Sequence, residues 1–160
     1  MTKQQNNKFL ILIFFIIIFA FISALFIEYV MGHQSCKLCI YQRIPYVISI
    51  FLIIVIFVYK KYKKNILLIL SLTFFASAIL AFYHFGIEQG FFNESQVCNT
   101  NDGVNVSSVD LLKELKEKVI SCKDVTFRLM GLSLATINTL FSLALSAIFL
   151  LLFLKNEKNK

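Results

Sequence analysis

The chain of 160 residues is short of the residues on which soluble and fibrous proteins depend. Charged side chains make up 16% of it, against roughly 25% in an ordinary soluble domain. It has no tryptophan, one proline and five glycines. So little charge excludes a disordered tail and an ordinary cytosolic enzyme, and so little glycine and proline excludes a collagen-like repeat. Hydrophobic residues account for 58% of the chain, more than a soluble globule of this size could bury, so we expect one domain embedded in a bilayer.

Four uncharged apolar runs predict four membrane-spanning helices. A helix needs about 20 residues to cross a hydrocarbon core ~30 Å thick, and the runs lack the period-two alternation of barrel strands. We therefore predict an all-α polytopic membrane protein, a single four-helix bundle over residues 1–160. The first run is longer than the 7–15-residue core of a signal peptide, so we expect it to be retained. The helices are expected at about 9–27, 41–59, 66–86 and 129–154, with outer loops at 28–40 and 87–128.

Lysines predict the orientation of the bundle. Nine of the sixteen basic residues lie at the two ends and in the linker between the second and third runs. Because Lys and Arg are enriched in cytoplasmic segments, we expect both termini in the cytoplasm and both long loops outside. No basic residues alternate with aromatic residues on an exposed element, which disfavours nucleic acid as a partner. All four cysteines then lie on the outer side, where an oxidising environment permits disulfides.

Two further patterns concern packing. Ser107 or Ser108 is a candidate N-cap, and the amphipathic stretch 109–119 after it predicts a short helix in the second outer loop. That helix would lie either on the membrane surface or on top of the bundle. Small residues recur at four-residue spacing in the third and fourth runs, which allows close helix packing in lipid. Asn138 is expected to make a hydrogen bond between helices.

Cys36 and Cys39 form a C-x-x-C motif that leads directly into a helix. This spacing closes a small loop with a disulfide of tunable potential, and the positive end of the helix favours a thiolate. The alternative is half of a structural zinc site, which needs two more ligands. Cys98 and Cys122 do not form a second C-x-x-C, so we predict no metal.

Cys98 and Cys122 close a loop in the second outer segment. A structural disulfide there would stabilise the fold by roughly 3 kcal/mol. Beside a C-x-x-C at the membrane face, exchange between the two pairs is the second interpretation. Arg43 is expected at the outer interface, because the second apolar run is short for a span and its helix must extend beyond this residue.

The segment Cys-Lys-Leu-Cys-Ile-Tyr-Gln-Arg, residues 36–43, resembles the signature of the bacterial disulfide bond formation protein B (DsbB) family. The stretch 131–135, Gly-Leu-Ser-Leu-Ala, is also similar to that family, and the resemblance covers nearly the whole chain. It implies a bacterial inner-membrane enzyme that reoxidises a periplasmic thioredoxin-fold dithiol oxidase (DsbA-like). The electrons would pass to a membrane quinone, either ubiquinone or menaquinone.

The resemblance also implies a role for each site residue. The partner would attack Cys98, the Cys36–Cys39 disulfide would reoxidise Cys98 and Cys122, and Cys39 would face the quinone. Arg43 would hold the quinone and stabilise its developing negative charge, although an interfacial anchor is the other interpretation of this residue. His84, near the outer end of the third helix, is a weaker candidate for quinone contact or protonation.

Two other classes of protein fit parts of the pattern. One is a non-enzymatic four-helix membrane scaffold whose outer loops carry two structural disulfides. The other is a thiol–quinone enzyme that runs in the opposite direction and is similar to vitamin K epoxide reductase. The order of the two cysteine pairs along the chain disfavours this last interpretation.

Overall fold

The protein is a bundle of long helices, seen in a computed structural model that describes residues 3–33, 35–93, 98, 121–123, 128–129 and 131–158. Four helical stretches are long and apolar enough to cross a membrane, so the predicted all-α, four-span class is confirmed. The elements are α1 (Lys3–Tyr29), α2 (Lys37–Tyr41), α3 (Ile44–Val58), the 3-10 turn η1 (Lys60–Tyr62), α4 (Lys63–Glu88), β1 (Arg128–Leu129), β2 (Leu132–Ser133) and α6 (Leu134–Lys158).

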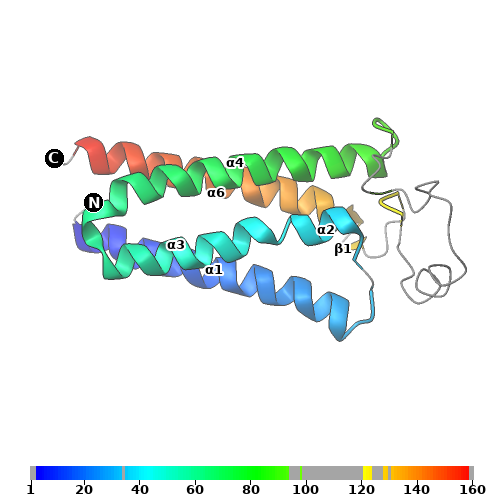
Figure 1. Ribbon diagram of the computed structural model, residues 1–160, viewed down its shortest axis with the longest axis horizontal. Helices are drawn as coiled ribbons and strands as arrows, with labels where there is room; N and C mark the ends of the chain where they lie inside the picture. Colours follow the sequence, from blue (N-terminus) through cyan, green and yellow to red (C-terminus); the bar gives the residue numbers. More distant parts are fainter. Residues whose placement is uncertain are drawn as a thin grey trace, which may run out of the picture.

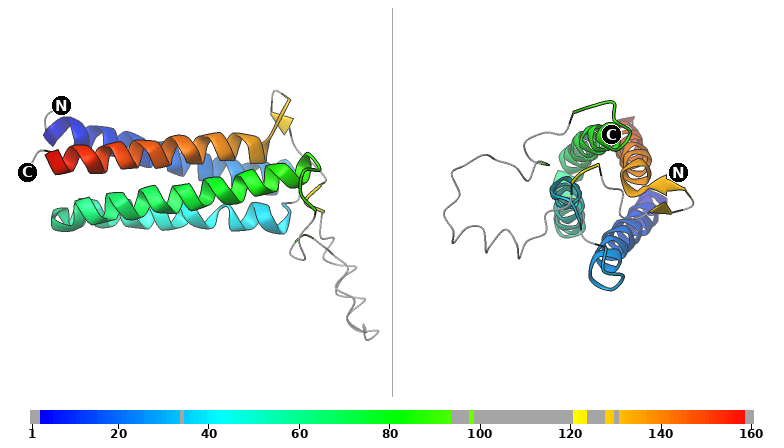
Figure 2. Two further views of the ribbon diagram at one scale, coloured as in Figure 1. Left: turned by 90° about the horizontal axis from the view of Figure 1, so that it is seen from above. Right: turned by 90° about the vertical axis from the view of Figure 1, so that its right-hand side faces the viewer.

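The first and last helices begin and end together at one end of the bundle, and α2 and β1 lie at the other (Figure 1). Seen end-on, the helices stand around a common axis, with α4 directly beside α6 (Figure 2). Many large apolar side chains on the outer surface of the bundle are exposed, as expected of a surface that faces lipid rather than water. Because the C-x-x-C motif leads into α2, the cysteine-bearing end of the bundle is the end opposite the termini.

The second span is broken in two. We predicted one helix starting near residue 41, whereas α2 starts at Lys37, four residues earlier, and α3 follows only at Ile44. Pro45 lies in the first turn of α3, where its missing N–H costs nothing, but a continuous helix would need that N–H to bond the carbonyl four residues back. Gln42 and Arg43 form the link, and the Arg43 carbonyl accepts the first backbone bonds of α3.

Serines join α4 to α6. Ser71 and Ser146 each donate a side-chain hydrogen bond to the other's carbonyl, at 3.1 and 3.0 Å, and the hydroxyls of Ser77 and Ser142 lie 3.2 Å apart. All four side chains are buried. Small polar side chains let two backbones approach closely in lipid, where packing rather than the hydrophobic effect holds helices together. The predicted packing of small residues is thus seen as a serine-lined α4–α6 contact.

A short hairpin precedes α6, and it corrects the predicted start of the last helix. The sequence predicted helix from residue 129, but Arg128 pairs with Ser133 and Leu129 with Leu132 in an antiparallel ladder. Gly131 turns this hairpin with a φ of +84°, a conformation that favours glycine. Ser133 then accepts a hydrogen bond from the backbone N–H of Thr136 at 3.2 Å, which caps α6 at its observed start. The amphipathic helix predicted for 109–119 lies outside the described residues.

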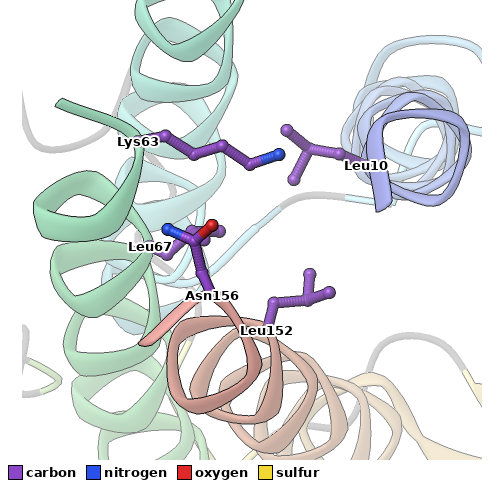
Figure 3. Close-up of a pocket in the computed structure, with 5 residues that line it drawn as sticks. All are labelled: Leu10, Lys63, Leu67, Leu152 and Asn156. Atoms are coloured by element: carbon purple, nitrogen blue, oxygen red, sulfur yellow. The ribbon is translucent and has the colours of Figure 1, made fainter. Parts of the chain in front are cut away.

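A small cavity lies between α1, α4 and α6 near the chain termini (Figure 3). Its volume is about 10 Å³, room for about one water molecule. Its lining residues are Leu10, Lys63, Leu67, Leu152 and Asn156. The cavity is too small for an organic ligand and is far along the bundle from the cysteines.

Candidate redox site

The C-x-x-C motif forms the first turn of α2. Cys36 is the N-cap residue, and its sulfur accepts a hydrogen bond from the backbone N–H of Cys39 at 3.3 Å. The two Sγ atoms lie 2.7 Å apart, and both cysteines are free. The predicted Cys36–Cys39 disulfide would need the two sulfurs to approach only slightly further. Since the helical turn already brings the sulfurs together, the bond can close or open with little backbone movement.

His84 of α4 lies beside this pair and is buried, with 3% of its surface exposed. Its Nε2 is 3.5 Å from the Cys36 sulfur, and its Nδ1 is 2.9 Å from the side-chain amide of Gln42. Glu88, one turn along α4, places Oε1 3.6 Å from the same Nε2. The other oxygen of this carboxylate, Oε2, is buried with no hydrogen-bond partner among the described residues. One imidazole thus connects a thiol, an amide and a carboxylate.

A chain of hydrogen bonds leads from His84 into the bundle. The amide of Asn138, on α6, donates to Gln42 Oε1 at 2.8 Å, and the hydroxyl of Tyr46, on α3, donates to Asn138 Oδ1. This confirms the expected interhelical bond of Asn138. Because Gln42 accepts from Asn138 with its oxygen, its NH₂ group faces His84 Nδ1 and leaves the ring hydrogen on Nε2, toward the sulfur.

The second cysteine pair is part of the same cluster. A disulfide joins Cys98 and Cys122, and both residues are 2% exposed. They pack with Cys36 and Ile87 in one buried cluster, with Cys39 at its edge. All four sulfurs therefore lie at one end of the bundle, which is the arrangement that exchange between the pairs requires.

Arg43, in the link after α2, faces the end of α1. Its guanidinium forms an ion pair with Glu28 and donates to the Ser35 hydroxyl at 2.6 Å. About a fifth of each side chain of the ion pair is exposed (18% for Arg43 and 19% for Glu28). These bonds hold the loop between α1 and α2 and leave further guanidinium donors available.

The surroundings of Cys36 favour its thiolate. Cys39 donates a side-chain hydrogen bond to it, and this contact, together with His84 and the Cys39 backbone N–H, outweighs burial and lowers the pKa of Cys36 to about 5. At neutral pH, Cys36 in the reduced pair is therefore a thiolate. A thiolate is both the attacking species and the better leaving group in disulfide exchange.

The sequence pointed to six site residues, and five of them share one cluster: the four cysteines and His84. Arg43 is set apart from them by its ion pair with Glu28. The sequence placed Glu88 one helical turn after His84 but assigned no role to it, and it did not predict the buried position of Gln42. Nothing local in the sequence places Gln42 against His84.

This fold and site define a multi-pass helical membrane protein with a thiol–disulfide centre at one end. The chain matches the family described as "Disulfide bond formation protein DsbB" over residues 6–152 and belongs to that family. It is thus a member of a family of membrane thiol oxidoreductases that act in disulfide bond formation. It is also 26% identical to the "Uncharacterized protein RP370" of Rickettsia prowazekii (strain Madrid E), over 99% of this chain and 94% of that protein. No solved structure matches it.

Proposed function

We propose that this protein oxidises a periplasmic thioredoxin-fold dithiol protein of the DsbA type and transfers the electrons to a membrane quinone. One observation carries the proposal: two cysteine pairs share one buried cluster at the membrane end, one closed and one open. The supply of disulfides to exported proteins would follow from this activity. The proposed location is the bacterial inner membrane, with the termini in the cytoplasm and the cysteines on the periplasmic side, as the lysine distribution favours.

The proposed reaction has three balanced steps. A thiolate of the partner attacks Cys98 and displaces Cys122, and the partner's second thiol resolves this mixed disulfide, which leaves Cys98 and Cys122 as thiols. These thiols then reduce the Cys36–Cys39 disulfide and become a disulfide again. Finally the reduced Cys36–Cys39 pair gives two electrons to the quinone, which takes up two protons and becomes a quinol; one proton comes from the Cys39 thiol and the other is the one that Cys36 released when it ionised.

Two features of the chain suit a quinone as the acceptor. Arg43 provides a fixed cation, since Glu28 and Ser35 orient its guanidinium, and such a cation stabilises charge that develops on a quinone oxygen. Around it, α2 and the start of α3 present exposed apolar side chains suited to a lipid-dissolved ring, namely Ile40, Tyr41, Ile44 and Val47. A bound quinone supplies a two-electron, two-proton acceptor, which the side chains of the protein do not provide.

In this proposal His84 acts on the Cys36 thiol. Its Nε2 faces the sulfur of Cys36 and the carboxylate of Glu88, so it can stabilise the Cys36 thiolate and pass the proton that the dithiol releases. Direct contact of His84 with the quinone, the weaker expectation from its place near the outer end of the third predicted helix, stays a prediction.

The scaffold interpretation has less support. It requires two closed, inert bridges, whereas the lowered pKa of the Cys36 thiol is typical of reactive cysteines. Inert structural bridges have potentials below about −300 mV. A measured potential well above that value for the C-x-x-C pair would exclude the scaffold.

The test is quinone consumption by the purified protein with a short-chain quinone and a reduced thioredoxin-fold partner. We expect steady turnover in the natural protein and none when any one of the four cysteines is changed to serine. A partner that lacks its second cysteine should accumulate as a mixed disulfide on Cys98, which peptide mass spectrometry identifies. His33→Gln, which changes a residue outside this chemistry, is the control. Normal turnover in a cysteine variant would refute the proposal.

A further inference from the structure

Three ligands suited to a thiophilic metal converge at the C-x-x-C motif. The sulfurs of Cys36 and Cys39 and a ring nitrogen of His84 all lie within 4.8 Å of one another. With Zn–S near 2.3 Å and Zn–N near 2.0 Å, a tetrahedral zinc site separates a sulfur and a nitrogen by about 3.5 Å and two sulfurs by about 3.8 Å. The distance from Cys36 Sγ to His84 Nε2 is already 3.5 Å. The two sulfurs, at 2.7 Å, have to move apart.

Of the carboxylates that the structure describes, Glu88 lies nearest to the fourth position, and it has to move closer to the sulfurs to occupy that position. Its side chain is 6% exposed, and Oε1 lies 3.6 Å from His84 Nε2, on the nitrogen that would bind the metal. Its Oε2 has no hydrogen-bond partner among the described residues. A buried carboxylate oxygen without a partner is costly, and a cation at this point would satisfy it. Two sulfurs, one nitrogen and one carboxylate oxygen form a complete four-coordinate set for Zn²⁺.

The hydrogen-bond chain behind His84 supports this use of the ring. A histidine that binds metal through Nε2 carries its hydrogen on Nδ1 and needs an acceptor there. Gln42, 2.9 Å from Nδ1, provides one when its amide turns to present the oxygen. Asn138 can turn with it, because the hydroxyl of Tyr46 beyond it can either donate or accept. These hydrogen bonds are therefore compatible with a hydrogen on either ring nitrogen of His84.

We propose that the reduced Cys36–Cys39 pair, with His84 and Glu88, forms a Zn²⁺ site that holds the motif in its dithiolate form and blocks reoxidation. Binding releases the thiol protons and changes no oxidation state. The site exists only in the reduced protein, because closure of the disulfide removes both thiolate ligands. The blocking effect rests on the proposed function, whereas the binding itself does not.

Metal binding can be measured directly on the full chain in detergent. The Cys98→Ser/Cys122→Ser variant, reduced and freed of reductant without air, is titrated with Co²⁺ as a coloured substitute for Zn²⁺. We expect one Co²⁺ per chain, with thiolate charge-transfer and tetrahedral ligand-field absorption, displacement by Zn²⁺, and no binding after the C-x-x-C pair is oxidised. A pair of thiols alone also binds zinc, so the contribution of the other two ligands has to be isolated.

Variants in that background separate the four-ligand site from a simple dithiol. His84→Gln should weaken Zn²⁺ binding at least about tenfold, since even the loss of an outer-shell partner costs 10–100-fold. His33→Gln changes the chain's other histidine and should leave affinity unchanged. X-ray absorption of the zinc-loaded parent protein gives an independent reading, because it should report two sulfur and two nitrogen or oxygen ligands. Equal affinity in His84→Gln and the parent, or a zinc shell without this composition, would overturn the site.

Turnover measurements separate this proposal from the preceding one. If both hold, Zn²⁺ slows quinone consumption by the natural protein and a chelator restores it. Zinc binding without any metal-free turnover would refute the proposed function and leave the site standing. Normal turnover without zinc binding would refute the site alone.

Discussion

The low pKa of Cys36 predicts how oxidising the C-x-x-C pair is. A thiol with its pKa near 5 is about 99% ionised at pH 7, whereas one with the ordinary value of 9.0 is about 1% ionised, a difference of about a hundredfold in the thiolate fraction. The thiolate exists only in the reduced pair, so the reduced form is stabilised by the same factor. Because a tenfold change corresponds to 29.6 mV for two electrons, this effect raises the potential of the pair by about 60 mV.

The test removes the hydrogen bond from Cys39, which contributes most to the low pKa of Cys36. In reduced protein that carries Cys98→Ser and Cys122→Ser, alkylation of Cys36 should rise with a midpoint near pH 5. Cys39→Ala should move this midpoint by several pH units toward 9, since the donor is gone. Cys39→Ser keeps a hydroxyl donor and is the matched control, with a midpoint that stays close to the low value.

The assay is alkylation by iodoacetamide across pH, with the Cys36 peptide quantified by mass spectrometry. The midpoint is the readout, because the plateau rate also changes with thiol nucleophilicity. His84→Gln should act in the same direction and make the C-x-x-C pair less oxidising by up to about 60 mV in a redox titration. An unchanged midpoint in Cys39→Ala, or a midpoint near 9 in the parent, would refute the reasoning.

Three further predictions concern the acceptor site and the bundle. Arg43→Ala should raise the KM for quinone more than it lowers kcat, and Arg43→Lys should recover part of the loss, as steady-state kinetics can show. Ser71→Val should lower stability by about 0.5–1.5 kcal/mol, because it removes the hydrogen bond that the Ser71 hydroxyl donates to the backbone carbonyl of Ser146 and keeps the bond from Ser146 to the Ser71 carbonyl; denaturant titration in detergent would measure this, and an unchanged midpoint would contradict it. Gly86→Ala should also destabilise the protein, since an added Cβ would lie 2.1 Å from the ring of Phe92. Thermal unfolding would measure this, and stability should recover in the double variant that also carries Phe92→Ala.

The number and type of the helices could be predicted from the sequence because a bilayer imposes a minimum length of apolar residues. The boundaries of the helices at the cysteine-bearing end could not be predicted in this way. The break before α3 depends on one proline, and the late start of α6 depends on a hairpin in which Gly131 makes the turn. Local packing decided both, and hydropathy does not report it.

The cysteines of the site could be recognised from their spacing, and Arg43 from the signature in which it lies. The contacts of His84 could not be predicted, because its partner Gln42 is 42 positions away in the chain, in the link between α2 and α3. Such a contact is set by how α2 and α4 are placed side by side. The Cys36–Cys39 disulfide stays a prediction, since a sequence does not specify the redox state of a labile pair.

The serine contacts between α4 and α6 divide the site into a stationary half and an adjustable half. His84 and Glu88 stand on α4, which is fastened to its neighbour along its length by Ser71 and Ser77. The sulfurs of the C-x-x-C motif instead lie at the N-cap and in the first turn of the five-residue helix α2, which Gln42 and Arg43 separate from α3. Closing and opening the disulfide would then require only small movements of α2 against α4. The surroundings of the His84 ring would therefore be restored after every turnover without repacking the bundle.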